Sequence, residues 1–187
     1  AVRVLIFMTK ESALFNIKPN CSNRLQKEIE TYDLLNKLNI PFAGIDHQAA
    51  MTIEDLGDTE SLLGISIAKN LFLRNSSKSK FYLLVMPGHK KFLTKNLSKQ
   101  IESSRLSFAD GSYMEEYLNI TPGSCSILGL MFDKEHKVNL VIDKDIIDSE
   151  YLGCHPCVNT SSLKIKTSDI MEVFLPHTGH EAAIVEL

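Results

Sequence analysis

The chain has 187 residues, of which 44% are hydrophobic and 23% charged, a composition typical of a globular protein with one or at most two domains. Apolar runs such as 4–8 and 83–86 are far shorter than the roughly 20 residues of a membrane span, and four cysteines are too few for a disulfide scaffold. Residues 1–8 lack the basic start and the small-residue cleavage site of a signal peptide. We therefore expect a cytoplasmic protein that does not associate with membranes.

The first half of the chain is predicted to contain one strong helix and several strands. The helix covers residues 24–38, where apolar side chains recur at helical spacing. Asn23 and Gln26 resemble a capping box at its start, and Thr52 with Asp55 resembles a second helix start. The predicted strands are the apolar runs at 2–8, 42–46, 70–73 and 81–86, the last two joined as a hairpin by the polar link 75–80.

The second half alternates more quickly between the two kinds of element. Helices are predicted at 94–101, 113–118 and 168–175, with Ser112 and Glu115 as a capping box for the second. Strands are predicted at 106–108, 126–132, 138–142, 159–165 and 183–187, and a loop at 153–156. Because several strands follow each other directly, the pattern indicates an α/β (α+β) fold with a mixed, partly antiparallel sheet surrounded by helices, and not a doubly wound parallel sheet.

Charge is distributed unevenly along the chain, although the net charge of −3 argues against a general nucleic-acid binder. No acidic residue occurs between Glu60 and Glu102, and eight lysines and arginines give this segment a charge of +8. The remaining chain has 12 basic and 23 acidic residues, a charge of −11. The asymmetry indicates a surface that faces a polyanion. A hairpin edge whose lysines face solvent and prevent edge-to-edge pairing is the alternative.

Few residues carry a recognisable chemistry. Cys154 and Cys157 have the spacing of a redox or zinc-binding pair, but no helix start and no second ligand pair accompany them, so we favour buried cysteines. The chain has no glycine-rich phosphate loop, nucleophile elbow or His-Glu-x-x-His sequence. His155 is a candidate because it lies in a predicted loop, where Pro156 restricts its backbone. Lys69 opens a strand and can point into a cleft to bind an anion, the alternative being a flanking surface charge.

Six stretches resemble, in the same order, the freestanding prolyl-tRNA editing proteins, which are relatives of the editing insertion domain of bacterial prolyl-tRNA synthetase. They are KNLFLR at 69–74, YLLV at 82–85, RLSFA at 105–109, YLNITPGS at 117–124, GCHPCVNT at 153–160, and DIMEVF with a later TGH at 169–180. His47 and Thr52 fit a further early region of the family pattern. The resemblance predicts a single editing domain at 23–187 and leaves a leading segment, 1–22, outside it.

The resemblance implies a mixed sheet curled toward a barrel, with helices packed around it. It also implies hydrolysis of the ester that joins a wrong amino acid to tRNA, most often alanine on proline tRNA, without a metal, a cofactor or a covalent nucleophile. The expected partner is the acceptor end of aminoacyl-tRNA, and a synthetase is a further candidate. A deacylase for cysteine or another small amino acid, and a non-catalytic tRNA-binding module, are the alternatives.

The resemblance assigns roles to individual residues. Lys69 is expected to hold the terminal phosphate or the carbonyl region of the substrate, and His155 to line the amino-acid pocket. The catalytic candidates are Lys69, Gly123, Ser124 and His155; the substrate-binding candidates are Thr121, Pro122, Ser126, Gly153 and Asn159; and the tRNA-binding candidates are Arg74, Lys90, Lys91 and Lys95. The chain departs from the family pattern at Ile127, which replaces a proline, at Cys157, which replaces a leucine, and at Asn119, which replaces a glycine and tolerates the same left-handed backbone.

Overall fold

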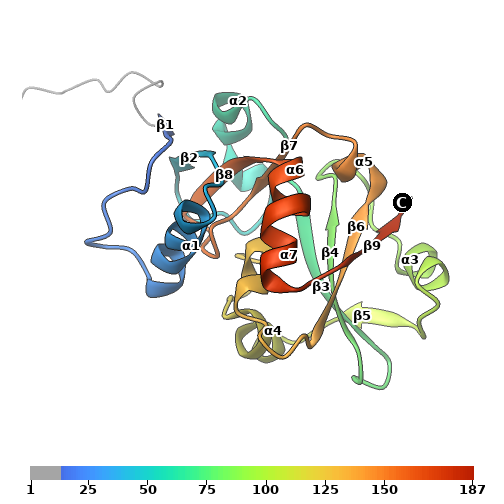
Figure 1. Cartoon of the computed structure of the whole chain (residues 1–187). Helices are drawn as coiled ribbons and strands as arrows, with labels where there is room; N and C mark the ends of the chain where they lie inside the picture. The colour runs from blue at the N-terminus through green and yellow to red at the C-terminus, as the bar shows by residue number, and fades with distance from the viewer. Residues whose placement is uncertain (1–13) are drawn as a thin grey trace, which may run out of the picture.

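The computed structural model describes residues 14–187 (Figure 1). The strand predicted at 2–8 lies outside the described residues. Within the described part, the leading segment contains a two-residue strand, β1 (Leu14–Phe15). Residues 14 and 15 pair with β2 (Phe42–Asp46), so part of the leading segment belongs to the fold.

The strands form two sheets. The first has the order β1-β2-β8-β7, with β7 at Tyr151–Cys154 and β8 at Ser161–Lys166, and all its pairs are antiparallel. The second has the order β5-β3-β4-β6-β9, with bounds Leu106–Phe108, Lys69–Asn75, Phe81–Met86, Val138–Asp143 and Ala182–Val185. In it β3 runs antiparallel to β4 and β5, whereas β4, β6 and β9 are parallel.

The sheets meet where Ile67 forms a parallel bridge with Gly153, next to a hydrogen bond from the Ala68 N–H to the Gly153 carbonyl oxygen (3.1 Å). The predicted mixed, partly antiparallel α/β fold is therefore confirmed. Its strands are divided between two curled sheets, which form no closed barrel over residues 14–187.

Helices surround both sheets (Figure 1). The α-helices are α1 (Gln26–Lys37), α2 (Thr59–Leu63), α3 (Thr94–Gln100), α4 (Gly111–Leu118), α5 (Lys144–Ile147), α6 (Thr167–Asp169) and α7 (Leu175–Thr178). A π-helical turn, Ile170–Phe174, joins α6 to α7, so the predicted helix at 168–175 is confirmed and extended to residue 178. Two 3₁₀ helices lie at Glu54–Leu56 and Ile127–Met131. No helix in the described part of the chain is long and apolar enough to cross a membrane.

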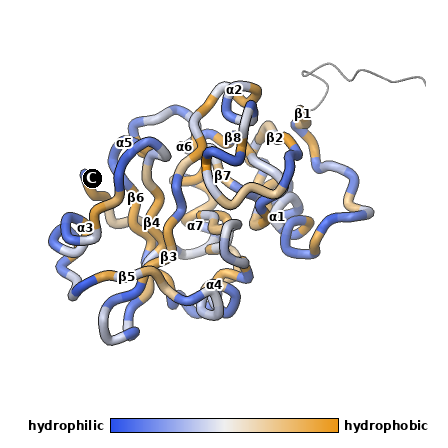
Figure 2. Tube along the Cα trace, turned by 180° about the vertical axis from the view of Figure 1, so that it is seen from behind, coloured by the Kyte–Doolittle hydropathy of each residue, from blue (hydrophilic) through white to orange (hydrophobic). Residues whose placement is uncertain are grey.

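Strand β4 holds the core together because both of its faces are buried. Leu83 and Val85 belong to the main core, which α1 and the C-terminal helix also fill. Leu84 and Met86 point to a second cluster that lies under α3. Strand β4 is correspondingly apolar in Figure 2. A strand that is apolar on every residue is typical of the centre of a sheet covered on both sides.

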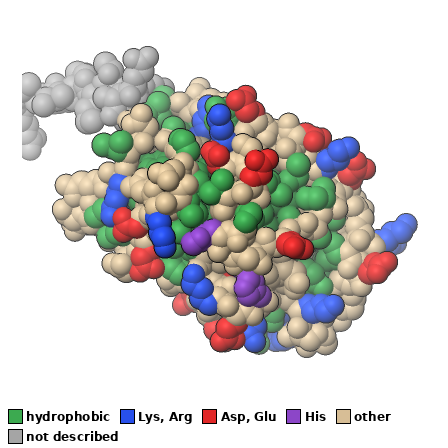
Figure 3. All heavy atoms as spheres, viewed as in Figure 1, with side chains coloured by type: hydrophobic (Ala, Val, Ile, Leu, Met, Phe, Trp, Pro, Cys, Tyr) green, Lys and Arg blue, Asp and Glu red, His purple; other side chains and the backbone are tan. Residues whose placement is uncertain are grey.

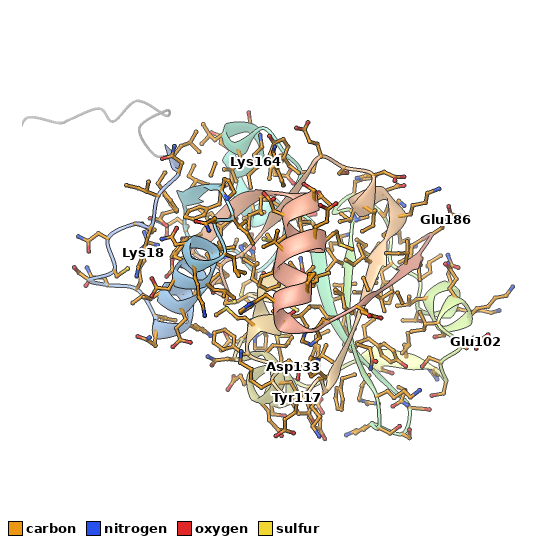
Figure 4. All side chains as sticks on the ribbon, viewed as in Figure 1. Lys18, Glu102, Tyr117, Asp133, Lys164 and Glu186 are labelled. Carbon is orange, nitrogen blue, oxygen red and sulfur yellow. The ribbon has the colours of Figure 1, made fainter. Side chains whose placement is uncertain are left out.

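A buried polar pair and an exposed one connect the last elements of the chain to its middle. The Asp133 carboxylate accepts hydrogen bonds from the N–H groups of Lys137 and Val138 and pairs with the buried His180 Nε2 at 3.1 Å. Asp133 lies below the C-terminal helix in Figure 4. Glu186, at the end of β9 in the same figure, pairs with Lys144 at 3.3 Å. These contacts attach the closing helix and strand to the loops around β6.

Four local predictions are wrong. Residues 127–131 form a 3₁₀ helix and not a strand, because the Ser126 side chain caps it by accepting a hydrogen bond from the Leu128 N–H. The predicted caps of α1 and α4 are also wrong, since their N-cap residues are Leu25 and Asp110 and neither uses a side-chain cap. The predicted loop at 153–156 begins only after Cys154, because β7 includes Gly153 and Cys154.

Two further predictions concern Thr52 with Asp55 and Asn119. Thr52 and Asp55 bond reciprocally, because the Asp55 N–H donates to Thr52 Oγ1 (3.3 Å) and the Thr52 N–H to Asp55 Oδ2 (2.9 Å), but the helix that begins here is a single 3₁₀ turn with Ile53 as its N-cap residue. Asn119 ends α4 in the left-handed conformation, with φ of 53°.

Candidate active site

A cavity of about 470 Å³ lies against the first residues of β3. Strand β5 pairs only with residues 73–75 of β3, so the edge of residues 69–72 faces this cavity. Its volume falls within the range of ordinary small-molecule sites. The residues that line it include Met51, Ala68, Lys69, Asn70, Leu71, Phe108, Met114, Pro122, Gly123, Cys125 and His155.

Lys69 is held in place at this cavity by a backbone contact. Its ammonium donates a hydrogen bond to the Lys90 carbonyl oxygen at 2.7 Å. The Lys90 side chain in turn pairs with the fully buried Asp143 (3.1 Å) and with Asp145 (2.8 Å). The loop that positions Lys69 is therefore itself fixed by an ion pair, and two of the three Lys69 ammonium protons stay free for a ligand.

His155 contributes a neutral ring to the cavity. Burial lowers the pKa of His155, and the neighbouring His47 acts in the same direction. His155 Nδ1 lies 2.8 Å from the Ser161 carbonyl oxygen, which can only accept, so Nδ1 carries the proton. Nε2 of the neutral ring then has a free lone pair. His155 can accept a hydrogen bond at Nε2, or it can act as a wall of the cavity.

A polar network fixes the strand that holds His155. The buried Ser161 donates a hydrogen bond to Asp46, and Asp46 pairs with Arg24 at 2.6 Å. Next to it, Ser162 Oγ lies 2.8 Å from His47 Nε2. Because the Ser161 carbonyl oxygen orients the His155 ring, contacts that fix β8 also fix the ring.

The loop at 121–126 approaches the cavity through its backbone. Gly123 has φ of 89°, a conformation that favours glycine, and a Cβ there would lie 2.6 Å from Met51 Sδ. The backbone N–H groups of Gly123 and Cys125 have no hydrogen-bond partner within residues 14–187. The Ile127 N–H donates to Asn70 Oδ1 at 2.9 Å, a bond that the family's proline could not form. Asn70 therefore anchors the end of this loop.

The structure brings only some of the predicted site residues to the cavity. Lys69, Pro122, Gly123 and His155 line it. The other catalytic and substrate-binding candidates do not line it. Thr121 is exposed, and Ser124 and Ser126 are buried. Gly153 borders a neighbouring cavity, and Asn159 is half-buried outside the lining.

The side chains of Ser126 and Asn159 are engaged in structural hydrogen bonds. Ser126 Oγ donates to the His155 carbonyl oxygen at 2.6 Å, and Asn159 Nδ2 donates to the Ala50 carbonyl oxygen at 3.1 Å. A side chain at Gly153 would collide with Ile67 Cδ1, 2.7 Å from the position of a Cβ. For these three residues the structure shows a packing or anchoring role.

Cys154 and Cys157 are buried, whereas Cys21 and Cys125 are half-buried. Burial raises the pKa of Cys125, Cys154 and Cys157 to about 12 in each case, so none is a thiolate near neutral pH. All four cysteines of the chain are free, and no group of three potential ligands within residues 14–187 could hold a metal ion.

The basic candidates differ in how much charge they present. Lys91 and Lys95 are exposed. Lys90 is neutralised by Asp143 and Asp145, and Arg74 is half-buried, with Nη1 donating to the Asn75 carbonyl oxygen at 3.2 Å. The face in Figure 3 mixes basic and acidic side chains and shows no large patch of either sign.

The sequence predicts no role for several residues that line the cavity. Asn70, Phe108, Met114 and Cys125 are examples. Asn70 lies in the stretch KNLFLR and Phe108 in RLSFA, so their position in these family-like stretches is the sequence signal that identifies them as site residues. For Met114 and Cys125 the sequence offers no signal that separates a cavity wall from the core.

The protein is a curled two-sheet α/β domain in which a lysine and a neutral histidine line an apolar cavity, an arrangement typical of a small-molecule site. Comparison with known proteins identifies its family. The aminoacyl-tRNA editing domain model matches residues 47–173. The chain belongs to the aminoacyl-tRNA editing domain family.

Relatives and a solved structure agree with this assignment. The prolyl-tRNA editing protein ProX of Acetoanaerobium sticklandii is 30% identical over 153 residues, which cover 82% of this chain and 93% of ProX. The prolyl-tRNA synthetase associated domain-containing protein 1 of Danio rerio is 28% identical and covers 86% of both chains. The crystal structure of hypothetical protein APE2540 shares the fold, with a TM-score of 0.62 at 16% identity over 84% of this chain and 98% of that one.

Proposed function

We propose that this protein is a trans-acting aminoacyl-tRNA deacylase that hydrolyses mischarged tRNA, with alanine on proline tRNA as its substrate. The observation that carries the proposal is the cavity at which the Lys69 ammonium, the neutral His155 ring and the free N–H groups of Gly123 and Cys125 come together. Membership of the editing family and the name of the ProX relative support the same reaction.

The proposed reaction needs no covalent intermediate. Water adds to the carbonyl carbon of the aminoacyl ester, and the carbonyl oxygen becomes an oxyanion. The bond from that carbon to the ribose oxygen then breaks, and the ribose oxygen takes the proton that the water lost, giving free amino acid and tRNA. An aminoacyl ester is already activated, so positioning and oxyanion stabilisation can supply the rate enhancement.

The cavity residues fit separate parts of this reaction. The N–H groups of Gly123 and Cys125 are free to donate to the developing oxyanion, and Lys69 has two ammonium protons for a substrate phosphate or carbonyl oxygen. The neighbouring ribose hydroxyl of the substrate can help to activate the water. His155 limits the room for the amino-acid side chain. This selectivity complements a synthetase pocket, in which the methylenes that alanine lacks are worth only about 1–3 kcal/mol.

A panel of mischarged tRNAs tests the proposal. Wild-type protein, the Lys69→Ala variant and a buffer blank are incubated with proline tRNA that carries alanine, cysteine, serine or proline, in the presence of a metal chelator. We expect alanine to be released fastest, proline to be retained, and the chelator to have no effect. Faster release of cysteine or serine would change the substrate. Binding without any hydrolysis would indicate the non-catalytic module. Binding to a proline-specific synthetase is a separate prediction, which this panel of tRNAs does not test.

A further inference from the structure

An exposed aromatic ring lies at the mouth of the cavity. Phe108 ends β5, lines the cavity, and is 61% exposed. It does not stand alone, because Phe92 contacts it edge to face with ring centroids 6.2 Å apart. An apolar cluster left open to water next to a polar site is typical of a surface that a ligand covers.

The surroundings of this cluster favour an anionic ligand with a flat apolar part. Strand β5 lies beside α3 in both Figure 1 and Figure 2, and the two elements are in contact. Lys91 and Lys95, both exposed, belong to α3 and the loop before it, in the segment without acidic residues. The carboxylate close in sequence to Phe108, that of Asp110, pairs with Lys78 at 3.9 Å. An aromatic ring flanked by lysines is the arrangement that binds single-stranded nucleic acid, in which bases stack on the ring and phosphates meet the cations.

We infer that Phe108 is a stacking platform for the terminal adenine base of the tRNA acceptor end. The inference rests on the proposed function and deepens it. When the aminoacyl group occupies the cavity, its ester is attached to the ribose of the terminal adenosine, so the adenine base must lie at the cavity mouth. Among the aromatic residues that line the cavity, Phe108 is the one whose side chain is mostly exposed. The base covers the ring, and the adjoining phosphates reach the lysines of the acid-free segment.

Steady-state deacylation measures the energetic effect. Phe108→Ala is expected to raise the KM for aminoacyl-tRNA by roughly 5- to 150-fold, the change that corresponds to losing one stacked base, with kcat close to wild type. Phe108→Tyr keeps an aromatic face and should keep the wild-type KM. Leu93→Ala removes a comparably exposed apolar side chain outside the cavity and is the matched control. Because Phe108 is exposed, thermal unfolding should be similar for all variants. An unchanged KM for Phe108→Ala would overturn the inference.

Fluorescence tests the contact without hydrolysis. The chain contains no tryptophan, so Phe108→Trp and the control Leu93→Trp each introduce a single indole reporter. Both variants are titrated with an uncharged RNA hairpin that ends in single-stranded CCA, and with the same hairpin lacking only the terminal adenine base. We expect the intact RNA, but not the abasic one, to quench the Phe108→Trp variant, and both RNAs to affect the Leu93→Trp variant equally. Equal quenching of the Phe108→Trp variant by both RNAs would overturn the stacking contact. Absence of deacylation by the wild type would instead overturn the proposed function.

Discussion

The ammonium of Lys69, a residue that lines the cavity, is fixed by a single carbonyl oxygen, that of Lys90. Lys69→Ala should therefore reduce deacylation by about 100- to 1,000-fold, the typical effect of losing one donor to a reacting group. The melting temperature should change little, because the side chain is half exposed and packs against little. Single-turnover hydrolysis and thermal unfolding of the variant check both parts. Lys37→Ala, at an exposed lysine that ends α1 and lies outside the cavity, should hydrolyse normally, and full activity of Lys69→Ala would contradict the site.

The ring of His155 is expected to act as a wall. His155→Ala should enlarge the amino-acid end of the cavity, so that hydrolysis of bulkier prolyl-tRNA rises while that of alanyl-tRNA falls only moderately. A general base would behave differently, since its loss typically costs about 100- to 10,000-fold for every substrate. The measurement is deacylation of both tRNAs by the wild type and the variant, with circular dichroism as the check on folding. An equal collapse on both tRNAs would make His155 a proton carrier.

The same residue predicts a pH dependence of stability. Burial lowers the pKa of His155 below the value of about 6.5 that it has in the unfolded chain. Below that pH the unfolded state binds more protons than the folded state, so the free energy of unfolding falls as the pH falls. His155→Gln cannot titrate. Between about pH 7.5 and about pH 5 we therefore expect the melting temperature of the wild type to drop further than that of the variant. Parallel curves for the two proteins would mean that His155 titrates as in the unfolded chain.

At the scale of elements, the 3₁₀ helix Ile127–Met131 depends on one hydroxyl. Ser126 Oγ caps this helix and also donates to the His155 carbonyl oxygen, and the residue is fully buried. Ser126→Ala leaves that carbonyl oxygen and the Leu128 N–H without their partner and should lower the free energy of unfolding by about 1–3 kcal/mol. Urea unfolding measures the change. Ser112→Ala, at an exposed residue that does not cap α4, should stay within about 0.5 kcal/mol of the wild type. Equal effects would show that the cap contributes nothing.

The same helix shows what the sequence could not predict. Hydrophobic periodicity predicts α1, the β3–β4 hairpin and β6, because their patterns are long or clearly bounded. The short apolar run at 126–132 fits either a strand or a buried helix. Besides the Ser126 cap, the start of the observed helix is held by Asn70, which accepts a hydrogen bond from the Ile127 N–H 57 positions away. Contacts between residues so distant in sequence leave no mark in local periodicity.

The candidate site divides along the same line. The motifs single out Lys69 and His155, and both line the same cavity: Lys69 is the first residue of β3, and His155 follows the last residue of β7. They do not reveal that Ser126 turns away into the core. Nor does the run of lysines reveal that Lys90 meets Asp143, which comes 53 positions later. Sequence motifs therefore locate the loops of the site, and packing decides which side chains face it.

At the scale of the whole molecule, two lysines of the acid-free segment are ion-paired with carboxylates outside it: Lys90 with Asp143, and Lys78 with Asp110. Lys90 is paired with the buried Asp143, so its removal would leave that carboxylate uncompensated and destabilise the loop that holds Lys69. Lys91 and Lys95 are exposed, and their charges face solvent. A test of tRNA binding should therefore change Lys91 and Lys95 and leave Lys90 intact.

Salt dependence of binding tests this surface. Each phosphate that a lysine neutralises releases counterions, so the logarithm of the affinity falls linearly with the logarithm of the salt concentration, by about 0.7–0.9 per contact. The double variant Lys91→Gln and Lys95→Gln should reduce that slope by about 1.4–1.8 and weaken binding of uncharged tRNA most at low salt. The matched control is Lys37→Gln with Lys166→Gln, two exposed lysines of which the first ends α1, across the molecule from α3 in Figures 1 and 2. The control variant changes the net charge equally, so an equal loss of slope in both variants would mean that overall charge attracts the tRNA. An unchanged slope in the variant of Lys91 and Lys95 would mean that these two lysines only face solvent.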